Sequence, residues 1–197
     1  MSFLESVRAG GRTVVAISLR GRGGSDAPLE GWTPEHHWQD IEAVLGLEDI
    51  ESAHLVGHSV GGAYALGYAL NMPKRVASLT IGDHPPLVPP FDEDWEREVS
   101  EPGRYDVHPE LAARIRRESR FANYTPSLDR LTVPLLVVHG SREGALLQSD
   151  DLELFARAPH CTMTSTDAGH DVFDSVDTAR AWSVFVANLE ASDETPT

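Results

Sequence analysis

Cysteine and lysine are nearly absent from this sequence. Its 197 residues contain one cysteine, Cys161, and one lysine, Lys74. A single cysteine excludes an internal disulfide framework and is typical of proteins in a reducing compartment. No apolar run approaches the roughly 18 residues that a membrane-spanning helix requires, and residues 1–10 lack the hydrophobic region of a signal peptide. We therefore expect a cytoplasmic protein with no membrane role.

Positive charge is also scarce. The chain has 16 basic residues against 31 acidic ones, which gives a formal net charge of −15. That field repels phosphate backbones and anionic lipid, so we expect no nucleic-acid partner. No cluster of histidine, cysteine and acidic residues has metal-ligand spacing, so the sequence predicts neither a metal nor another cofactor.

Apolar runs alternate with amphipathic stretches along most of the chain. This alternation predicts an α/β fold with a mostly parallel sheet flanked by helices. The expected strands span residues 13–18, 52–56, 76–81, 135–139 and 161–165. The expected helices span residues 34–45, 61–70, 151–158 and 172–189. The length suits a single domain, 1–197.

One segment, residues 84–131, interrupts the alternation. It opens with a cluster of prolines and continues through charged, helix-like pieces. A segment of about 45 residues buries too little apolar surface to fold alone. We therefore predict a small helical lid inserted into the domain, and we expect residues 191–197 to form a frayed polar tail.

The most informative stretch is Gly57-His58-Ser59-Val60-Gly61, which has the pattern G-x-S-x-G. It lies between an expected strand and an expected helix. A chain that turns at once from strand to helix strains the serine backbone and exposes its hydroxyl, while the small neighbours let the two elements pass. We therefore predict that Ser59 is a nucleophile and that the Val60 N–H stabilises a developing oxyanion.

A serine nucleophile requires a base and an acid that orients the base. His170 follows the last expected strand, in a loop at the sheet edge where ligands bind in open α/β sheets. Glu143 follows the strand 135–139 and is our leading candidate for the acid. Asp83, at the end of the strand 76–81, is the alternative.

Four other side chains are candidates for lining a substrate pocket. Two adjoin the expected catalytic residues and two belong to the expected lid: His58, His84, Trp95 and Tyr124. Aromatic lid residues pack against one another as readily as against a ligand, so that role also remains open for them.

Taken in order, these motifs resemble the α/β-hydrolase superfamily. Residues 18–26 resemble the loop after the fourth strand of that family, and Gly57–Gly61 its nucleophile elbow. Residues 133–143 resemble the strand and loop that carry the acid, and Gly169-His170 the histidine loop. The resemblance covers nearly the whole chain and implies the fold; it says little about the substrate.

The resemblance also implies further strands before residue 13, which this sequence does not show. In the family, a His-Gly loop after the third strand supplies a second oxyanion donor, and losing one donor typically costs about 100- to 1,000-fold in rate. Three interpretations remain: an N-terminally truncated sequence, a strand supplied by a partner chain as in a homodimer, or a reduced fold with impaired hydrolysis.

The leading functional hypothesis is a serine hydrolase acting on a small-molecule carboxylic ester, lactone or thioester. Ser59 would form an acyl-enzyme, with His170 as base and Glu143 as the orienting acid. The alternatives are a non-catalytic binding protein of the same fold and a cofactor-free enzyme resembling the perhydrolases.

Overall fold

A parallel four-stranded sheet forms the centre of the molecule. The computed structural model describes residues 3–101 and 107–193. The strands β1 (Ala53–His58), β2 (Val76–Gly82), β5 (Leu135–Gly140) and β6 (Cys161–Thr166) lie in the order β1-β2-β5-β6. Each neighbouring pair is parallel. The predicted fold class is therefore confirmed.

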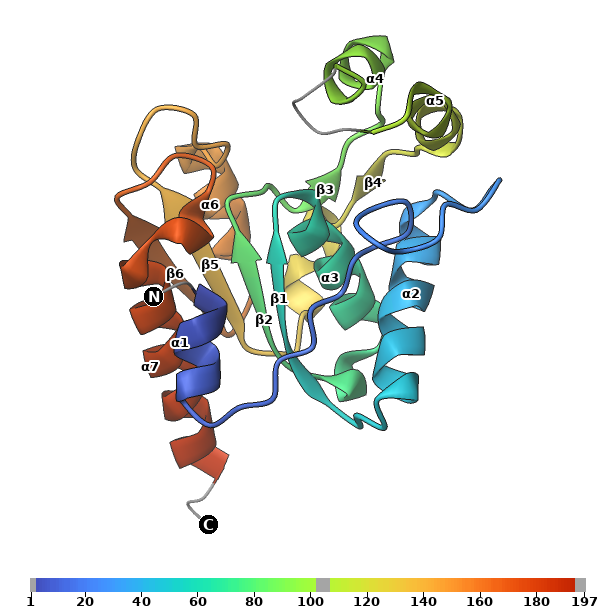
Figure 1. The fold of residues 1–197 in the computed structure, drawn as a ribbon. Helices are drawn as coiled ribbons and strands as arrows, with labels where there is room; N and C mark the ends of the chain where they lie inside the picture. The colour runs from blue at the N-terminus through green and yellow to red at the C-terminus, as the bar shows by residue number, and fades with distance from the viewer. Residues whose placement is uncertain (1–2, 102–106, 194–197) are drawn as a thin grey trace.

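Helices cover both faces of this sheet (Figure 1). The larger core includes side chains from α2 (Pro34–Leu47), α3 (Val60–Asn71) and α6 (Ser149–Phe155). The smaller core, on the opposite face, includes α1 (Phe3–Ala9) and α7 (Val176–Asp193).

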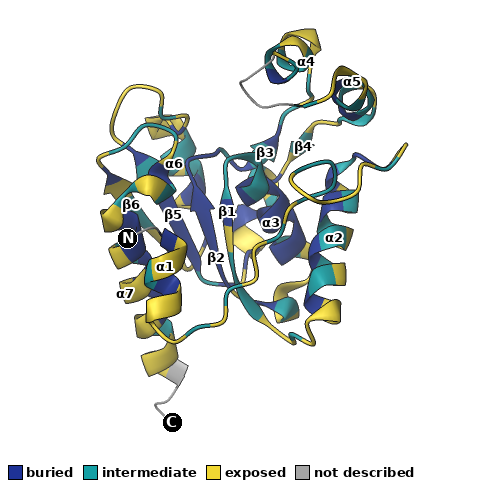
Figure 2. Cartoon of the chain, in the orientation of Figure 1, coloured by how far each residue is buried: buried dark blue, intermediate teal, exposed yellow. Residues whose placement is uncertain are grey.

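Alternate side chains of strand β5 pack into the two cores. Its residues Leu135 and Val137 belong to the larger core, whereas Leu136 and Val138 belong to the smaller one. All four side chains are at most 1% exposed, and Figure 2 shows the central strands as buried. This alternation is what a strand covered on both faces requires.

The expected strand at residues 13–18 is absent, so that prediction was wrong. Val14 packs against the smaller core and Leu19 against the larger core. Val15 between them is exposed. Among the described residues β1 pairs with β2 alone, so residues 13–18 contribute no ladder hydrogen bonds to the sheet.

Strand β1 is consequently an edge strand among the described residues. Its Val56 is 38% exposed. An unpaired strand edge offers free backbone groups to another strand. A second copy that supplies this strand remains a prediction, which sedimentation at several protein concentrations would test.

The predicted lid leaves the sheet after β2 and returns at β5. It contains α4 (Glu93–Val99), α5 (Pro109–Glu118), and the antiparallel pair β3 (Leu87–Val88) and β4 (Ala122–Asn123). The 3-10 turn η2 (Thr125–Arg130) precedes β5, and two further 3-10 turns, η1 (Pro73–Arg75) and η3 (Val172–Asp174), lie outside the lid. In Figure 1, α4 and α5 stand beyond the carboxyl ends of the sheet strands; Ser59 directly follows the end of β1.

The C-terminal helix begins and ends four residues later than expected, at Val176 and Asp193 instead of residues 172 and 189. Helix α7 continues to Asp193, so the predicted frayed tail begins inside a helix. Residues 194–197 of that tail lie outside the described residues.

Candidate active site

Ser59 forms the turn between β1 and α3, and its backbone is strained. Its φ of 53° and ψ of −140° lie where L-residues rarely occur, which typically costs about 1–3 kcal/mol. The Ser59 N–H donates to the carbonyl of Gly82 at 2.9 Å. A Cβ on Gly57 would lie 2.5 Å from the Gly62 Cα, so only glycine fits there.

Asp83 follows β2, the strand beside β1, and its carboxylate is fully buried. Backbone N–H groups donate to this carboxylate from Leu146 at 2.7 Å, Leu147 at 3.3 Å and Gly140 at 3.4 Å. A buried charge requires such compensation. The Asp83 backbone also has a positive φ, 47°. The structure thus fixes both the main chain and the side chain of this residue.

His170 completes the arrangement from the loop after β6. Its Nδ1 lies 2.9 Å from the Asp83 Oδ2, and its side chain is 29% exposed. Because a carboxylate can only accept, Nδ1 carries the proton and the Nε2 of the neutral ring is left free to act as a base. Asp83 therefore fixes both the tautomer and the orientation of His170.

The model of the Alpha/beta hydrolase family matches residues 1–190. The chain belongs to the α/β-hydrolase family.

Individual relatives agree with this membership. An acetyltransferase component of the acetoin cleaving system of Pseudomonas putida is 41% identical over 79 residues, which are 40% of this chain and 21% of that protein. The putative carbamate hydrolase RutD of Variovorax paradoxus is 37% identical over 79 residues, 40% of this chain and 30% of that protein. The matched stretches thus span under a third of either relative.

A solved structure extends the likeness to nearly the whole chain. The esterase RhEst1 from Rhodococcus sp. ECU1013 superimposes with a TM-score of 0.72 at 19% sequence identity. The match covers 94% of this chain and 84% of that one. At this identity the likeness shows a shared fold.

Glu143 does not reach His170 in this α/β-hydrolase, so the choice of acid needs correction. The side chain of Glu143 is exposed, whereas Asp83 contacts His170. The loop after β5 is held by its main chain, through Ser141 N–H to the Thr166 carbonyl and Arg142 N–H to the Ala168 carbonyl. A Cβ on Gly169 would lie 2.9 Å from the Glu143 carbonyl oxygen. The backbone of Glu143 therefore faces the histidine loop and its carboxylate faces solvent.

His58 and His84 lie close to the Asp83–His170 pair. The His58 Nε2 is 2.9 Å from the His170 carbonyl oxygen. His84 is 6% exposed, with its Nδ1 2.9 Å from the Pro85 carbonyl. Burial lowers the pKa of His84 and the Pro85 carbonyl raises it; the nearby His170 and His58 lower it, and the Asp83 carboxylate raises it. The structure thus gathers three imidazoles around one carboxylate.

Trp95 and Tyr124 have packing roles instead. Trp95 stacks on Phe91 within the lid, with ring centroids 4.3 Å apart. Tyr124 is 8% exposed and belongs to the larger core, with its ring 6.3 Å from that of Trp38. The prediction that these two aromatic residues line the substrate pocket therefore gains no support.

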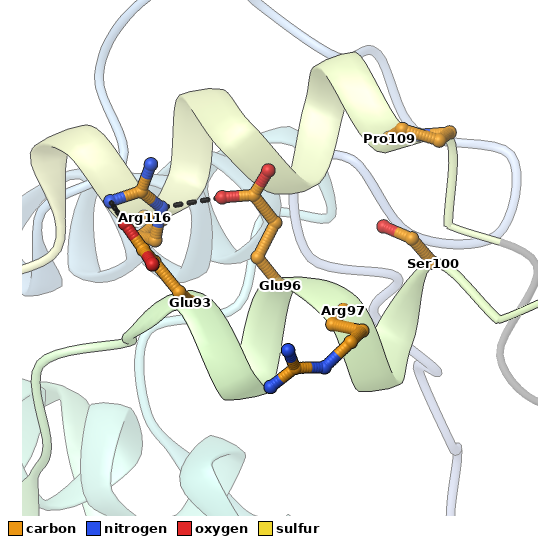
Figure 3. Close-up of a pocket in the computed structure, with 6 residues that line it drawn as sticks. All are labelled: Glu93, Glu96, Arg97, Ser100, Pro109 and Arg116. Atoms are coloured by element: carbon orange, nitrogen blue, oxygen red, sulfur yellow. Dashed lines mark hydrogen bonds and ion pairs between the residues drawn. The ribbon is translucent and has the colours of Figure 1, made fainter.

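Two hollows in the described residues lie apart from this site. One, of about 350 Å³, lies between α4 and α5 (Figure 3) and is lined by Glu93, Glu96, Arg97, Ser100, Pro109 and Arg116. Arg116 spans it through an ion pair with Glu96 at 2.5 Å. The other, of about 280 Å³, lies between the C-terminal end of α3 and η2 and is lined by Leu70, Asn71, Tyr124, Ser127 and Arg130. Neither is lined by Ser59, Asp83 or His170.

Sequence reasoning missed the groups that hold the site together. Phe173 packs edge-on against His58, with centroids 5.8 Å apart, and a Cβ on Gly82 would lie 2.3 Å from the Phe173 ring. The N–H groups of Leu146 and Leu147 were also unforeseen, because backbone donors leave no mark in a side-chain pattern. The one available signal was Gly82-Asp83, a glycine and an acid directly at a strand end.

No group of three or more histidine, cysteine or acidic side chains within residues 3–101 and 107–193 could hold a metal ion. Over the same residues, every helix is too short or too polar to cross a membrane.

Proposed function

We propose that this α/β-hydrolase is a serine hydrolase that cleaves a small-molecule carboxylic ester, lactone or thioester. The observation that carries the proposal is the 2.9 Å contact between His170 Nδ1 and Asp83 Oδ2, beside the strained turn at Ser59. An acid and a base held in this order next to a strained serine are the parts that acyl transfer requires.

In the first half of the reaction, the Ser59 Oγ attacks the substrate carbonyl carbon while His170 Nε2 takes the hydroxyl proton. The Asp83 carboxylate stabilises the resulting imidazolium. Negative charge on the carbonyl oxygen is stabilised by the Val60 N–H, because Val60 is the first residue of α3 and that N–H has no partner within the helix. His170 then protonates the leaving oxygen or sulfur, and an ester remains on Ser59.

In the second half, water attacks the ester carbonyl and His170 takes its proton. The tetrahedral intermediate collapses, His170 returns the proton to Ser59 Oγ, and the carboxylic acid leaves. The similarity to the putative carbamate hydrolase RutD of Variovorax paradoxus supports carbonyl chemistry of this kind.

A fluorophosphonate probe tests this proposal, because it phosphonylates only activated serines. We expect stoichiometric labelling of the wild-type chain, mapped to Ser59 by peptide mass spectrometry. Ser59→Ala should abolish the label. Ser52→Ala, which removes an exposed serine outside the site, should leave it unchanged. A folded wild-type chain that takes no label would overturn the proposal and favour a non-catalytic binding protein.

A further inference from the structure

His58 is the last residue of β1 and directly precedes Ser59. Its Cα pairs with that of Gly82 in β2, so it lies beside the strand end that leads into Asp83. Its side chain is partly buried, and its Nε2 reaches the loop that carries His170.

In the hydrogen bond between His58 and the His170 carbonyl, only His58 can be the donor. Its Nε2 lies 2.9 Å from the His170 carbonyl oxygen, which can only accept. The Nε2 of His58 therefore carries a proton and donates it. The same carbonyl accepts from the Val172 N–H at 2.8 Å, so it has a partner for each of its two lone pairs.

Ring packing reinforces this contact. The imidazoles of His58 and His170 have centroids 4.6 Å apart, with an interplanar angle of 36°. Phe173 packs edge-on against the His58 ring, with centroids 5.8 Å apart. His58 thus meets the histidine loop through its donor and through its ring face.

The strand order shows why this contact matters. Ser59 follows β1 at one edge of the described sheet, and His170 follows β6 at the other edge, with β2 and β5 between them. Asp83 fixes the imidazole of His170 but not the position of its main chain. His58 ties that main chain directly to the strand that ends at the nucleophile.

We propose that His58 is a positioning residue, which holds the His170 main chain so that Nε2 stays within reach of the Ser59 hydroxyl. This inference rests on the proposed serine hydrolase function. His58 acts through His170, whose main chain and ring it contacts. Misplacing a catalytic group by about 1 Å can cost 100-fold in rate, so losing this restraint should reduce turnover more than substrate binding.

Two variants separate the donor from the ring. His58→Phe keeps a flat ring without a donor, and His58→Gln places an amide N–H near the position of Nε2 without a ring. We expect His58→Phe to lower kcat about 10- to 100-fold at nearly unchanged KM, and its labelling by the fluorophosphonate should slow by the same factor. His58→Gln should remain within about threefold of the wild type, as expected if the hydrogen bond is the main restraint.

Hydrogen–deuterium exchange of the peptide covering residues 167–174 provides a measurement independent of activity. Exchange should be faster in His58→Phe than in the wild type and His58→Gln, at equal thermal stability. Equal kcat and equal exchange in wild type and His58→Phe would overturn the inference while leaving the serine mechanism intact. Loss of the kcat effect together with a rise in KM would also overturn it. Absence of labelling in the folded wild type would instead overturn the proposed function, and with it any part of His58 in that chemistry.

Discussion

Asp83 and Glu143 follow neighbouring parallel strands and end at the same edge of the sheet, yet they have opposite environments. Asp83 is fully buried and contacts His170, whereas Glu143 is exposed to solvent. Asp83 comes directly after Gly82, the last residue of β2, and its own N–H donates to the Val138 carbonyl of β5 at 2.8 Å. Glu143 comes three residues after the end of β5, in a turn where the Ala145 N–H donates to the Arg142 carbonyl at 3.3 Å.

The difference shows that distance from the strand end decides which acid can orient a base. The main chain of Asp83 is held by its hydrogen bond to β5, and this leaves one available direction for its side chain. A residue at the tip of a turn can place its charge in water at lower cost, because burying a carboxylate requires donors to replace its hydration. Three backbone N–H groups supply this replacement at Asp83.

Asp83→Asn should have the largest effect, because it retains the shape of the side chain but removes the charge that fixes the His170 tautomer. We expect kcat for an activated ester, such as a p-nitrophenyl ester, to fall about 10⁴-fold. Steady-state kinetics over a range of pH would measure it. A loss below tenfold in a folded variant would show that another acid serves His170.

Gly140→Ala tests the packing on which the comparison depends. A Cβ at this position would lie 2.2 Å from the Gly169 carbonyl oxygen and 2.5 Å from that of Ala168. Because both atoms are backbone, the histidine loop must move. We expect a loss of about 1–3 kcal/mol in the free energy of unfolding and a fall in kcat of roughly 100-fold.

Gly46→Ala in α2 is the matched control, since nothing lies within 4 Å of a Cβ there. Its effect should be a gain of about 0.5–1 kcal/mol, because alanine restricts the unfolded chain more than glycine does. Urea unfolding would measure both variants. Equal stabilities for the two would contradict the close approach of the loops.

The pH dependence of stability tests the burial of His84, the residue after Asp83. The folded pKa of His84 lies below the unfolded value, mainly because of burial. The unfolded chain therefore binds more protons as the pH falls below about 6.5, so His84 destabilises the fold increasingly in acid. In urea unfolding at pH 7 and at pH 5, the loss of stability should be smaller in His84→Gln than in the wild type. An equal or larger loss in that variant would contradict the burial of a neutral His84.

Glu143→Gln should have the smallest effect. Its carboxylate is exposed and contacts neither His170 nor Asp83 among the contacts of the described residues. We expect kcat and KM to stay within about twofold of the wild type. The free energy of unfolding should change by at most about 0.5 kcal/mol, as is usual for surface substitutions. A tenfold loss of kcat would restore Glu143 as the acid and reverse the comparison.

Local patterns in the sequence were sufficient to predict most of the sheet and the identity of two catalytic candidates. Each of β1, β2, β5 and β6 was foreseen to within two residues. The clearest was β5, because an apolar run between Pro134 and Gly140 is typical of a buried parallel strand. Ser59 was identified from the spacing of its glycines, and its positive φ agrees with the strained turn they predict. His170 was identified from its place after the last strand.

The segment 13–18 and the choice of acid required the structure. A β-branched run favours a strand, but a strand also needs a neighbour that runs alongside it. Residues 13–18 pair with none of the four sheet strands, although Val14 and Leu19 pack against its two cores.

The scarcities of the sequence and its short motifs together determined an α/β chain with one cysteine, a net charge of −15 and a serine at a strand–helix turn. Only the tertiary structure decided that Asp83 contacts His170, that Glu143 faces solvent and that His58 reaches the histidine loop. The reason is physical: strand and turn propensities act between near neighbours in the chain. Hydrogen bonds between residues 83 and 170, or 58 and 170, depend on how the strands are ordered and which carboxylate finds buried donors.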